Sequence, residues 1–274
     1  MMQDSEKLAM RAVSKLLTMI LAAALSVAPA AQGVEFEVAS VKPHTSDDQR
    51  VMMLAQPGGR FVAANIPLKL LIRTTFQIQD DQIVGGPGWL TTDRFDIEAR
   101  APAGHDGFAE LPGMLRALLT DRFKLVTHTE KRELPVFALE RASRDGAIGP
   151  GLRPTECPEP SVDLSGASPC MKIQTGLGSL TLRGMPLDRF IPWLSANVNR
   201  VVVDRTGLQG RHDIDLKWTP EQLGQRSGNG PPATDPDALS IFTALQEQLG
   251  LKLDSTRDTV DVLVIDGVEH PTPN

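Results

Sequence analysis

The sequence contains no tyrosine, and its aromatic residues amount to only 4% of the chain. It also lacks an excess of basic residues, since 28 Lys and Arg stand against 34 Asp and Glu and the net charge is −6. Nucleic-acid binding depends on basic surface that neutralises phosphates and, for single strands, on aromatic rings that stack with bases. The composition therefore argues against a nucleic-acid partner, and the scarcity of aromatic rings also argues against a platform for sugars.

The common catalytic motifs are missing as well. The sequence has no G-x-S-x-G, S-x-x-K or H-E-x-x-H pattern and no glycine-rich phosphate loop. The nearest approach to such a loop is Gly85-Gly86-Pro87-Gly88, which no Lys-Ser/Thr pair follows and whose proline has no backbone N–H to donate. We interpret this segment as a tight turn that presents Trp89 as a binding residue, with anion binding as the alternative.

Only two cysteines are present, Cys157 and Cys170, and they flank a segment rich in Pro, Ser and Gly. Their spacing matches neither a C-x-x-C redox motif nor a zinc knuckle. In an oxidising compartment we expect the pair to form one structural disulfide, worth about 3 kcal/mol for a loop of this length. Two unpaired thiols are the alternative.

The N-terminus has the organisation of a secretory signal. Basic residues precede an apolar run at 16–27, and the small residues Ala28-Pro29-Ala30-Ala31 follow it. The run is too short to span a hydrocarbon core of about 30 Å comfortably, although an uncleaved anchor or a buried helix is an alternative. We expect residues 1–30 to be a signal peptide, and the mature protein to be periplasmic or secreted with no membrane span.

The second half of the sequence repeats the first. Gly59–Ile72 returns as Gly178–Ile191, and each copy continues into an alternating strand, at 95–99 and at 212–216. A repeated unit of roughly 85–95 residues is far longer than a solenoid repeat. The sequence therefore predicts two homologous subdomains.

Each copy is expected to contain a strand, a helix, two strands, a helix and two strands, which is an α+β fold. In the first copy Asn65 is interpreted as a helix N-cap. Lys124–His128 and Pro135–Arg141 are expected to pair as a hairpin. The predicted divisions are a signal peptide at 1–30, a first subdomain at 31–143, a linker with the cysteine pair at 144–176, and a second subdomain at 177–274.

One strand carries the candidate catalytic residues. In His212-Asp213-Ile214-Asp215, alternation places both carboxylates on one face and His212 on the other. With Asp204 or Asp188 they would form an oxygen-rich site for calcium. The bound ion would polarise an ester or lactone carbonyl, with His212 as the base.

A simpler interpretation competes with this one. Asp96 and Glu98 occupy the equivalent positions of the first copy, so the polar face is also explained as a solvated sheet surface. Asp204 has a structural explanation too, because it precedes Gly207 in a segment typical of a turn.

The chain resembles a family of exported soil-bacterial proteins, abundant in acidobacterial genomes, that is known as a domain of unknown function. The family has no established activity, cofactor or catalytic residues, and His212 departs from its usual aromatic residue. A looser likeness links the strand and following helix to the short N-terminal docking domain of secretins and TonB-dependent receptors. The matching segments are 36–43, 82–90, 95–99, 118–125, 203–210, 244–253 and 262–266.

These features predict an exported cell-envelope protein without a cofactor. We expect a non-catalytic binding or docking module whose partner is another envelope protein or a small ligand. The alternative is a secreted, calcium-assisted hydrolase that acts on a small ester or lactone.

Overall fold

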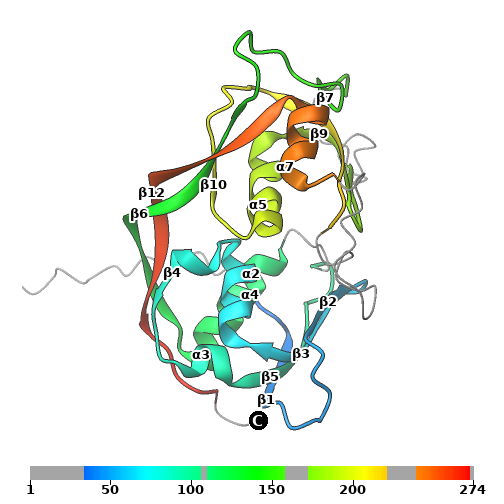
Figure 1. Cartoon of the computed structure of the whole chain (residues 1–274). Helices are drawn as coiled ribbons and strands as arrows, with labels where there is room; N and C mark the ends of the chain where they lie inside the picture. Colours follow the sequence, from blue (N-terminus) through cyan, green and yellow to red (C-terminus); the bar gives the residue numbers. More distant parts are fainter. Residues whose placement is uncertain (1–33, 106–109, 158–171, 221–238, 272–274) are drawn as a thin grey trace, which may run out of the picture.

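The structure is a computed structural model, and it describes residues 34–105, 110–157, 172–220 and 239–271. The predicted signal peptide at 1–30 and Cys170 lie outside these ranges. Helices and sheets occur together, which confirms the α+β class. Three four-stranded sheets organise the molecule, one in each half and one along the side that joins them (Figure 1). No helix in the described ranges is both long and apolar enough to cross a membrane.

The first half is built on an antiparallel sheet with the strand order β1-β5-β3-β2. Apolar residues of α2 recur at helical spacing and lie against the inward side chains of this sheet, as Leu68, Leu71 and Ile72 are all buried. The elements are β1 (Val38–Pro43), β2 (Met52–Gln56), β3 (Arg60–Pro67), α2 (Leu68–Phe76), η1 (Asp80–Gln82), β4 (Ile83–Gly85), α3 (Trp89–Thr92), β5 (Arg94–Arg100), α4 (Leu111–Phe123) and β6 (Val126–Arg141).

The second half has an antiparallel sheet with the order β7-β11-β9-β8. Strands β7 and β8 belong to this sheet, although both fall within the range predicted to be a linker. Their shortness explains why alternation did not reveal them. The elements are β7 (Leu152–Pro154), β8 (Lys172–Gly176), β9 (Ser179–Pro186), α5 (Leu187–Val198), β10 (Val202–Asp204), β11 (Arg211–Lys217), α7 (Ile241–Ala244), η2 (Leu245–Leu249) and β12 (Leu251–Gly267).

The third sheet joins the halves, in the order β10-β6-β12-β4. Its centre is one long antiparallel ladder in which β6 pairs with β12 from Val126–Gly267 to Arg141–Leu251. The prediction of a hairpin at 124–141 is therefore wrong, and so is the expected pair of closing strands in the second copy, because β12 is one continuous strand. The residues between the two strands expected at 124–141 carry no Gly, Asn or Asp that would favour a tight turn, and the distant β12 supplies the backbone partners that keep β6 extended.

Each long strand enters the core of the other half. Leu139, near the end of β6, packs in the second core, whereas Leu263 and Ile265, near the end of β12, pack in the first. The short parallel strands also pair across the halves. Strand β4 of the first half pairs with β12, and β10 of the second half pairs with β6. The two cores are therefore completed reciprocally. Descent of the halves from one ancestral unit stays a prediction.

A bulge occurs at corresponding places in β3 and β9. Asn65 and Gly184 have left-handed backbone, with φ of 53° and 63°. Their N–H groups donate to Asp96 Oδ1 at 2.9 Å and to Asp213 Oδ1 at 2.8 Å. The N-cap interpretation of Asn65 is wrong, because β3 continues to Pro67 and that proline is the N-cap of α2.

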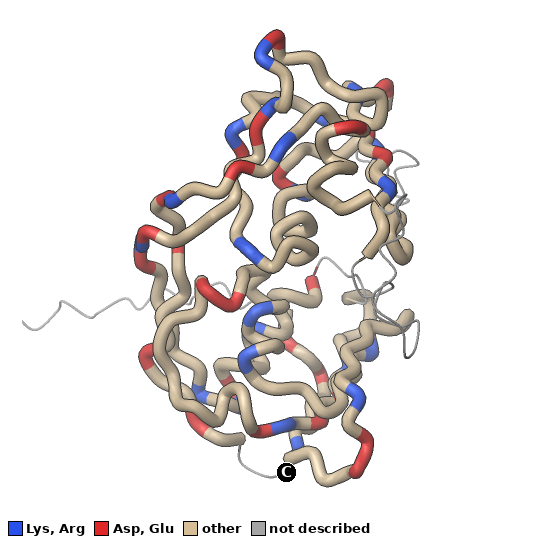
Figure 2. Tube along the Cα trace, viewed as in Figure 1, with Lys and Arg blue, Asp and Glu red and all other residues tan. Residues whose placement is uncertain are grey.

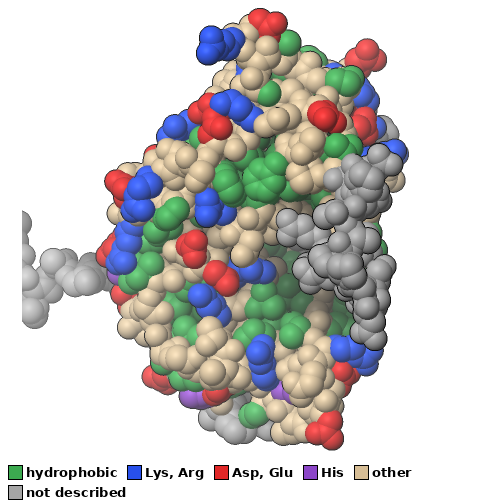
Figure 3. Space-filling view, in the orientation of Figure 1, with side chains coloured by type: hydrophobic (Ala, Val, Ile, Leu, Met, Phe, Trp, Pro, Cys, Tyr) green, Lys and Arg blue, Asp and Glu red, His purple; other side chains and the backbone are tan. Residues whose placement is uncertain are grey.

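Charged residues of both signs are interspersed over the two halves (Figure 2). On the face shown in Figure 3, apolar side chains lie among them and the surface is hollowed between the halves. Helices α2 and α5 border a pocket there that is lined by Arg73, Thr74, Gln77, Ile78, Gln79, Pro192 and Ala196.

Candidate functional site

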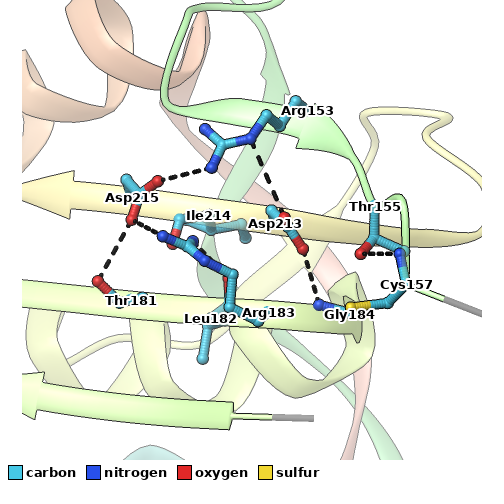
Figure 4. A network of polar contacts seen from close by, with 10 residues as sticks. All are labelled: Arg153, Thr155, Cys157, Thr181, Leu182, Arg183, Gly184, Asp213, Ile214 and Asp215. Carbon is cyan, nitrogen blue, oxygen red and sulfur yellow. Dashed lines mark hydrogen bonds and ion pairs between the residues drawn. The ribbon is translucent and has the colours of Figure 1, made fainter. Parts of the chain in front are cut away.

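The predicted carboxylates of β11 lie in a network with two arginines (Figure 4). Arg183 Nη2 donates to Asp215 Oδ1 at 2.7 Å, and Arg153 Nη2 donates to Asp215 Oδ2 at 3.2 Å. The hydroxyl of Thr181 also donates to Asp215 Oδ1, at 3.3 Å. Burial opposes the charge of Asp215, but the hydrogen bond from Arg183 and the charges of both arginines leave its pKa below the usual range.

The second carboxylate, Asp213, has a backbone role. Its Oδ1 accepts the Gly184 N–H in the bulge of β9, and its Oδ2 lies 4.0 Å from Arg153 Nε. Both aspartates thus face guanidinium groups, which already neutralise their charge. Within the described ranges, no group of three or more His, Cys, Asp or Glu side chains is placed to hold a metal ion. The arrangement is that of a structural ion-pair network.

His212 lies on the opposite side of β11, as alternation predicts. It is only 4% exposed, and its Nδ1 has no hydrogen-bond partner among the described residues. Its backbone neighbours are Met185 of β9 and Pro154 of β7. The imidazole therefore points into the second half's interior and away from Asp213 and Asp215.

The other two predicted oxygen ligands belong to separate elements. Asp204 ends β10, and its Oδ1 accepts the N–H of Thr206 at 2.8 Å, which fits the turn interpretation. Asp188 lies in the first turn of α5. The described structure therefore does not gather His212, Asp213, Asp215 and Asp204 into one site.

Trp89 begins the short helix α3 and is half-buried against the first core. Its ring stacks on His270 at 4.0 Å between centroids, and it meets Phe95 edge-on at 6.3 Å. His270 is held in place by Asp93 through a contact of 2.8 Å. One face of the predicted binding residue is therefore already covered by the chain itself.

Cys157 lies just beyond β7. Its N–H donates to the Thr155 hydroxyl at 3.2 Å, and its carbonyl accepts from Arg211 Nη2 at 2.7 Å. Because Cys170 lies outside the described residues, the Cys157–Cys170 disulfide stays a prediction.

Sequence reasoning overlooked His44 as a partner of Asp96. His44 Nδ1 lies 2.8 Å from Asp96 Oδ1, and its Nε2 lies 3.1 Å from the Asp48 carbonyl oxygen. Both partners are acceptors, so the ring makes both bonds only as an imidazolium. The hydrogen bond with Asp96 is the main reason that the pKa of His44 is raised. The pairing of β1 with β5 brings these residues together, and only that register would have revealed it.

His128 is a second histidine held between acceptor groups. Its Nδ1 lies 2.8 Å from Asp266 Oδ2 and its Nε2 lies 3.1 Å from Glu130 Oε1. These two carboxylates raise its pKa, with the Asp266 hydrogen bond contributing most. The site is half-exposed and bridges β6 and β12 at the bulge after Ile265.

Two edge strands present apolar side chains to solvent. Strand β2 is the outer strand of its sheet, and Met52 and Leu54 are 40% and 46% exposed, with Val51 just before them at 49%. Strand β8 is the corresponding edge of the second half and exposes Ile173. Exposed apolar edges are the surfaces that proteins otherwise protect against pairing with other chains.

A comparison with known protein families shows to which family the chain belongs. Residues 69–268 match the family described as "Protein of unknown function (DUF3738)". The chain belongs to this family. No curated protein matches it, and no solved structure matches it either.

The matched range of this family of unknown function includes the Asp213–Asp215 network, Trp89 and both long strands. Strands β1, β2 and β3 precede it. The family assignment therefore covers both interlocking strands and the second core, whereas the part of the first core on β1 and β3 and the exposed edge at β2 lie outside the match.

Proposed function

We propose that this protein is an exported, non-catalytic binding module that captures an extended, uncharged segment of another envelope protein on strand β2. The observation that carries this proposal is the exposure of Val51, Met52 and Leu54 along a sheet edge with which no strand of the described residues pairs. Export rests on the predicted signal peptide at 1–30.

The chemistry of β2 defines the partner. An edge strand offers free backbone N–H and C=O groups, and an added strand makes main-chain hydrogen bonds to them while side-chain positions select the sequence. Residues 51–57 contain no charged side chain, whereas natural edges are usually protected by lysine or other charges. A partner strand that carried charges opposite Met52 or Leu54 would have to desolvate them. An uncharged, alternating segment fits this edge best.

The competing sites are occupied by contacts within the chain. Trp89 stacks on His270, and the carboxylates of Asp213 and Asp215 pair with arginines. The hydrolase alternative requires His212 and these carboxylates to act together, but they lie on opposite faces of β11. The likeness to the docking domain of secretins and TonB-dependent receptors is in keeping with a docking role.

Binding of defined peptides tests the proposal. Short fluorescent peptides of alternating valine and threonine, compared with versions that carry lysine at alternate positions, are titrated into the mature protein and followed by anisotropy. We expect the neutral peptides to bind, and Leu54→Lys to abolish binding without lowering the melting temperature. The matched control is Ile173→Lys, which places the same charge on the corresponding edge strand β8.

Two results would overturn the proposal. The first is equal peptide binding by the wild type and Leu54→Lys. The second is turnover of an ester or lactone that disappears in Asp213→Asn or His212→Ala proteins whose fold is intact.

A further inference from the structure

An open pocket lies in the second half, and no residue of β2 lines it. It is formed by the β8–β9 turn, the end of α5, the residues that follow β11 and the start of α7. The side chains that line it include Leu177, Asn197, Asn199, Trp218, Ser240 and Phe242.

The lining combines aromatic surface with neutral hydrogen-bonding groups. Trp218 and Phe242 contribute rings, Asn197 and Asn199 contribute carboxamides, and Ser240 contributes a hydroxyl. None of the described lining residues is charged. A pocket of this composition suits a neutral ligand that has both an apolar face and several hydroxyl groups.

The rings of the pocket are supported from behind. Trp218 meets Trp193 edge-on at 5.4 Å, and Trp193 stacks on the buried Phe190 at 5.8 Å. Phe242, which is 38% exposed, meets Phe137 edge-on at 5.5 Å. Trp218 lines the pocket and Trp193 packs behind it, so two of the chain's three tryptophans lie at this place. The low aromatic content of the sequence, which argues against a platform for sugars, therefore does not apply to this part of the surface.

The backbone fixes the position of Trp218. Its N–H donates to the Gly178 carbonyl at 2.9 Å. Gly178 has φ of +75°, and a side chain there would place its Cβ 2.2 Å from the Trp218 carbonyl oxygen. Only glycine permits this approach, which sets the indole at the rim of the pocket.

The corresponding place in the first half has the same backbone contact but different chemistry. There the Ala101 N–H donates to the Gly59 carbonyl at 2.8 Å, so alanine occupies the place of Trp218. The adjacent pocket is lined by the charged residues Arg60, Glu98 and Arg100. The first half therefore does without an indole at this position. In the second half Trp218 is half-buried against the core and also lines the pocket, so part of its ring is available to a ligand.

We propose that this pocket binds a neutral saccharide. The C–H face of a sugar ring would lie on Trp218, and the ring hydroxyls would exchange hydrogen bonds with the carboxamide of Asn199 and donate to Oδ1 of Asn197. The Asn197 Nδ2 donates to the Trp193 carbonyl and the Ser240 hydroxyl caps α7, so these two groups hold the rim of the pocket in place. Fixed aromatic surface reduces the entropy lost on binding, because the rings are already held by Trp193 and Phe137. This site is independent of the β2 edge.

Calorimetric titration of the mature protein with cellohexaose, maltohexaose and hexa-N-acetylchitohexaose tests the proposal, with oligogalacturonate as the charged comparison. We expect at least one neutral saccharide to bind and to change the tryptophan fluorescence. Trp218→Ala should weaken binding by about tenfold or more, equivalent to about 1.4 kcal/mol, and Trp218→Phe by less. The matched control is Trp89→Phe, in the first half, which should leave affinity unchanged.

The proposal is overturned if no neutral saccharide binds, if only the charged oligomer binds, or if Trp218→Ala and Trp218→Phe bind as well as the wild type. Displacement of bound saccharide by the valine–threonine peptides would also overturn it, because the two sites would then be one. Leu54→Lys serves to separate the proposals, since it should leave saccharide binding intact.

Discussion

His212 and Phe95 occupy corresponding positions in the two halves. Each directly precedes the aspartate that accepts the bulge N–H, and each lies opposite the residue that follows the bulge, Met185 or Ile66. Both side chains are buried. The second half thus has an imidazole where the first has a phenyl ring that packs edge-on against Phe123 at 5.2 Å.

The imidazole of His212 lowers the free energy of unfolding relative to a phenyl ring at the same position. Its Nδ1 is buried without a partner among the described residues, and such a group costs about 1–3 kcal/mol. We expect His212→Phe to raise the free energy of unfolding by a value in that range, measured by urea denaturation. Phe95→His is the reciprocal control and should be destabilising. A loss of stability in His212→Phe would mean that the imidazole makes a favourable interaction.

The arginine network predicts the response to calcium. Because Arg153 and Arg183 already pair with Asp215, excess calcium or chelator should leave the melting temperature unchanged. Asp213→Ala should cost about 1–3 kcal/mol by leaving the Gly184 N–H unpaired, whereas Asp213→Asn keeps an acceptor and should cost less. A calcium-dependent rise in melting temperature that Asp213→Asn removes would contradict the structural interpretation.

The His44 contacts predict a loss of stability as the pH rises above about 6.5, the unfolded pKa of histidine. The pKa of His44 is raised in the folded protein, mainly by Asp96, above the unfolded value of about 6.5. Its contribution is therefore complete below the unfolded pKa and is lost as pH rises through the folded pKa. NMR titration of the imidazole gives that pKa directly. In His44→Gln this part of the pH dependence should vanish, and in the half-exposed control His105→Gln it should remain.

The exchanged long strands predict that the halves unfold together. Leu139→Ala should cost about 2–5 kcal/mol, because the side chain is completely buried in the second core. Leu139 lies on β6, which directly follows the first half in the sequence. Because the halves unfold together, Leu139→Ala should increase hydrogen exchange in both halves at the same denaturant concentration. Two separate transitions would show that the cores are independent.

Intact mass of the exported protein tests the processing predictions. A mature chain that begins near Ala31 and lacks alkylatable thiols without reductant would establish both the cleavage and the Cys157–Cys170 bridge. Retention of residues 1–30, or two reactive thiols, would contradict them.

The sequence allows the local features of the fold to be predicted. Alternation located β5 and β11, and helical spacing of Leu68, Leu71 and Ile72 located α2. It also placed His212 on the face opposite Asp213 and Asp215. These features depend on how apolar and polar side chains alternate along a single helix or strand. Residues close together in the sequence determine that pattern.

Features that depend on distant partners were not predictable. The continuity of β6 depends on β12, and the His44–Asp96 contact depends on the pairing of β1 with β5. The arginines that neutralise Asp215 come from β7 and β9. No pattern within a single element specifies such contacts, because each requires the register between strands that are far apart in sequence.

The reciprocal completion of the two cores has a consequence for a nicked chain. Arg144 lies in an exposed segment between β6 and β7, where trypsin would cut without touching either core. The resulting fragments would each retain a strand that the other needs, so non-covalent contacts alone would hold them in a native complex. Once the protein has folded, the peptide link between its halves is dispensable for their association.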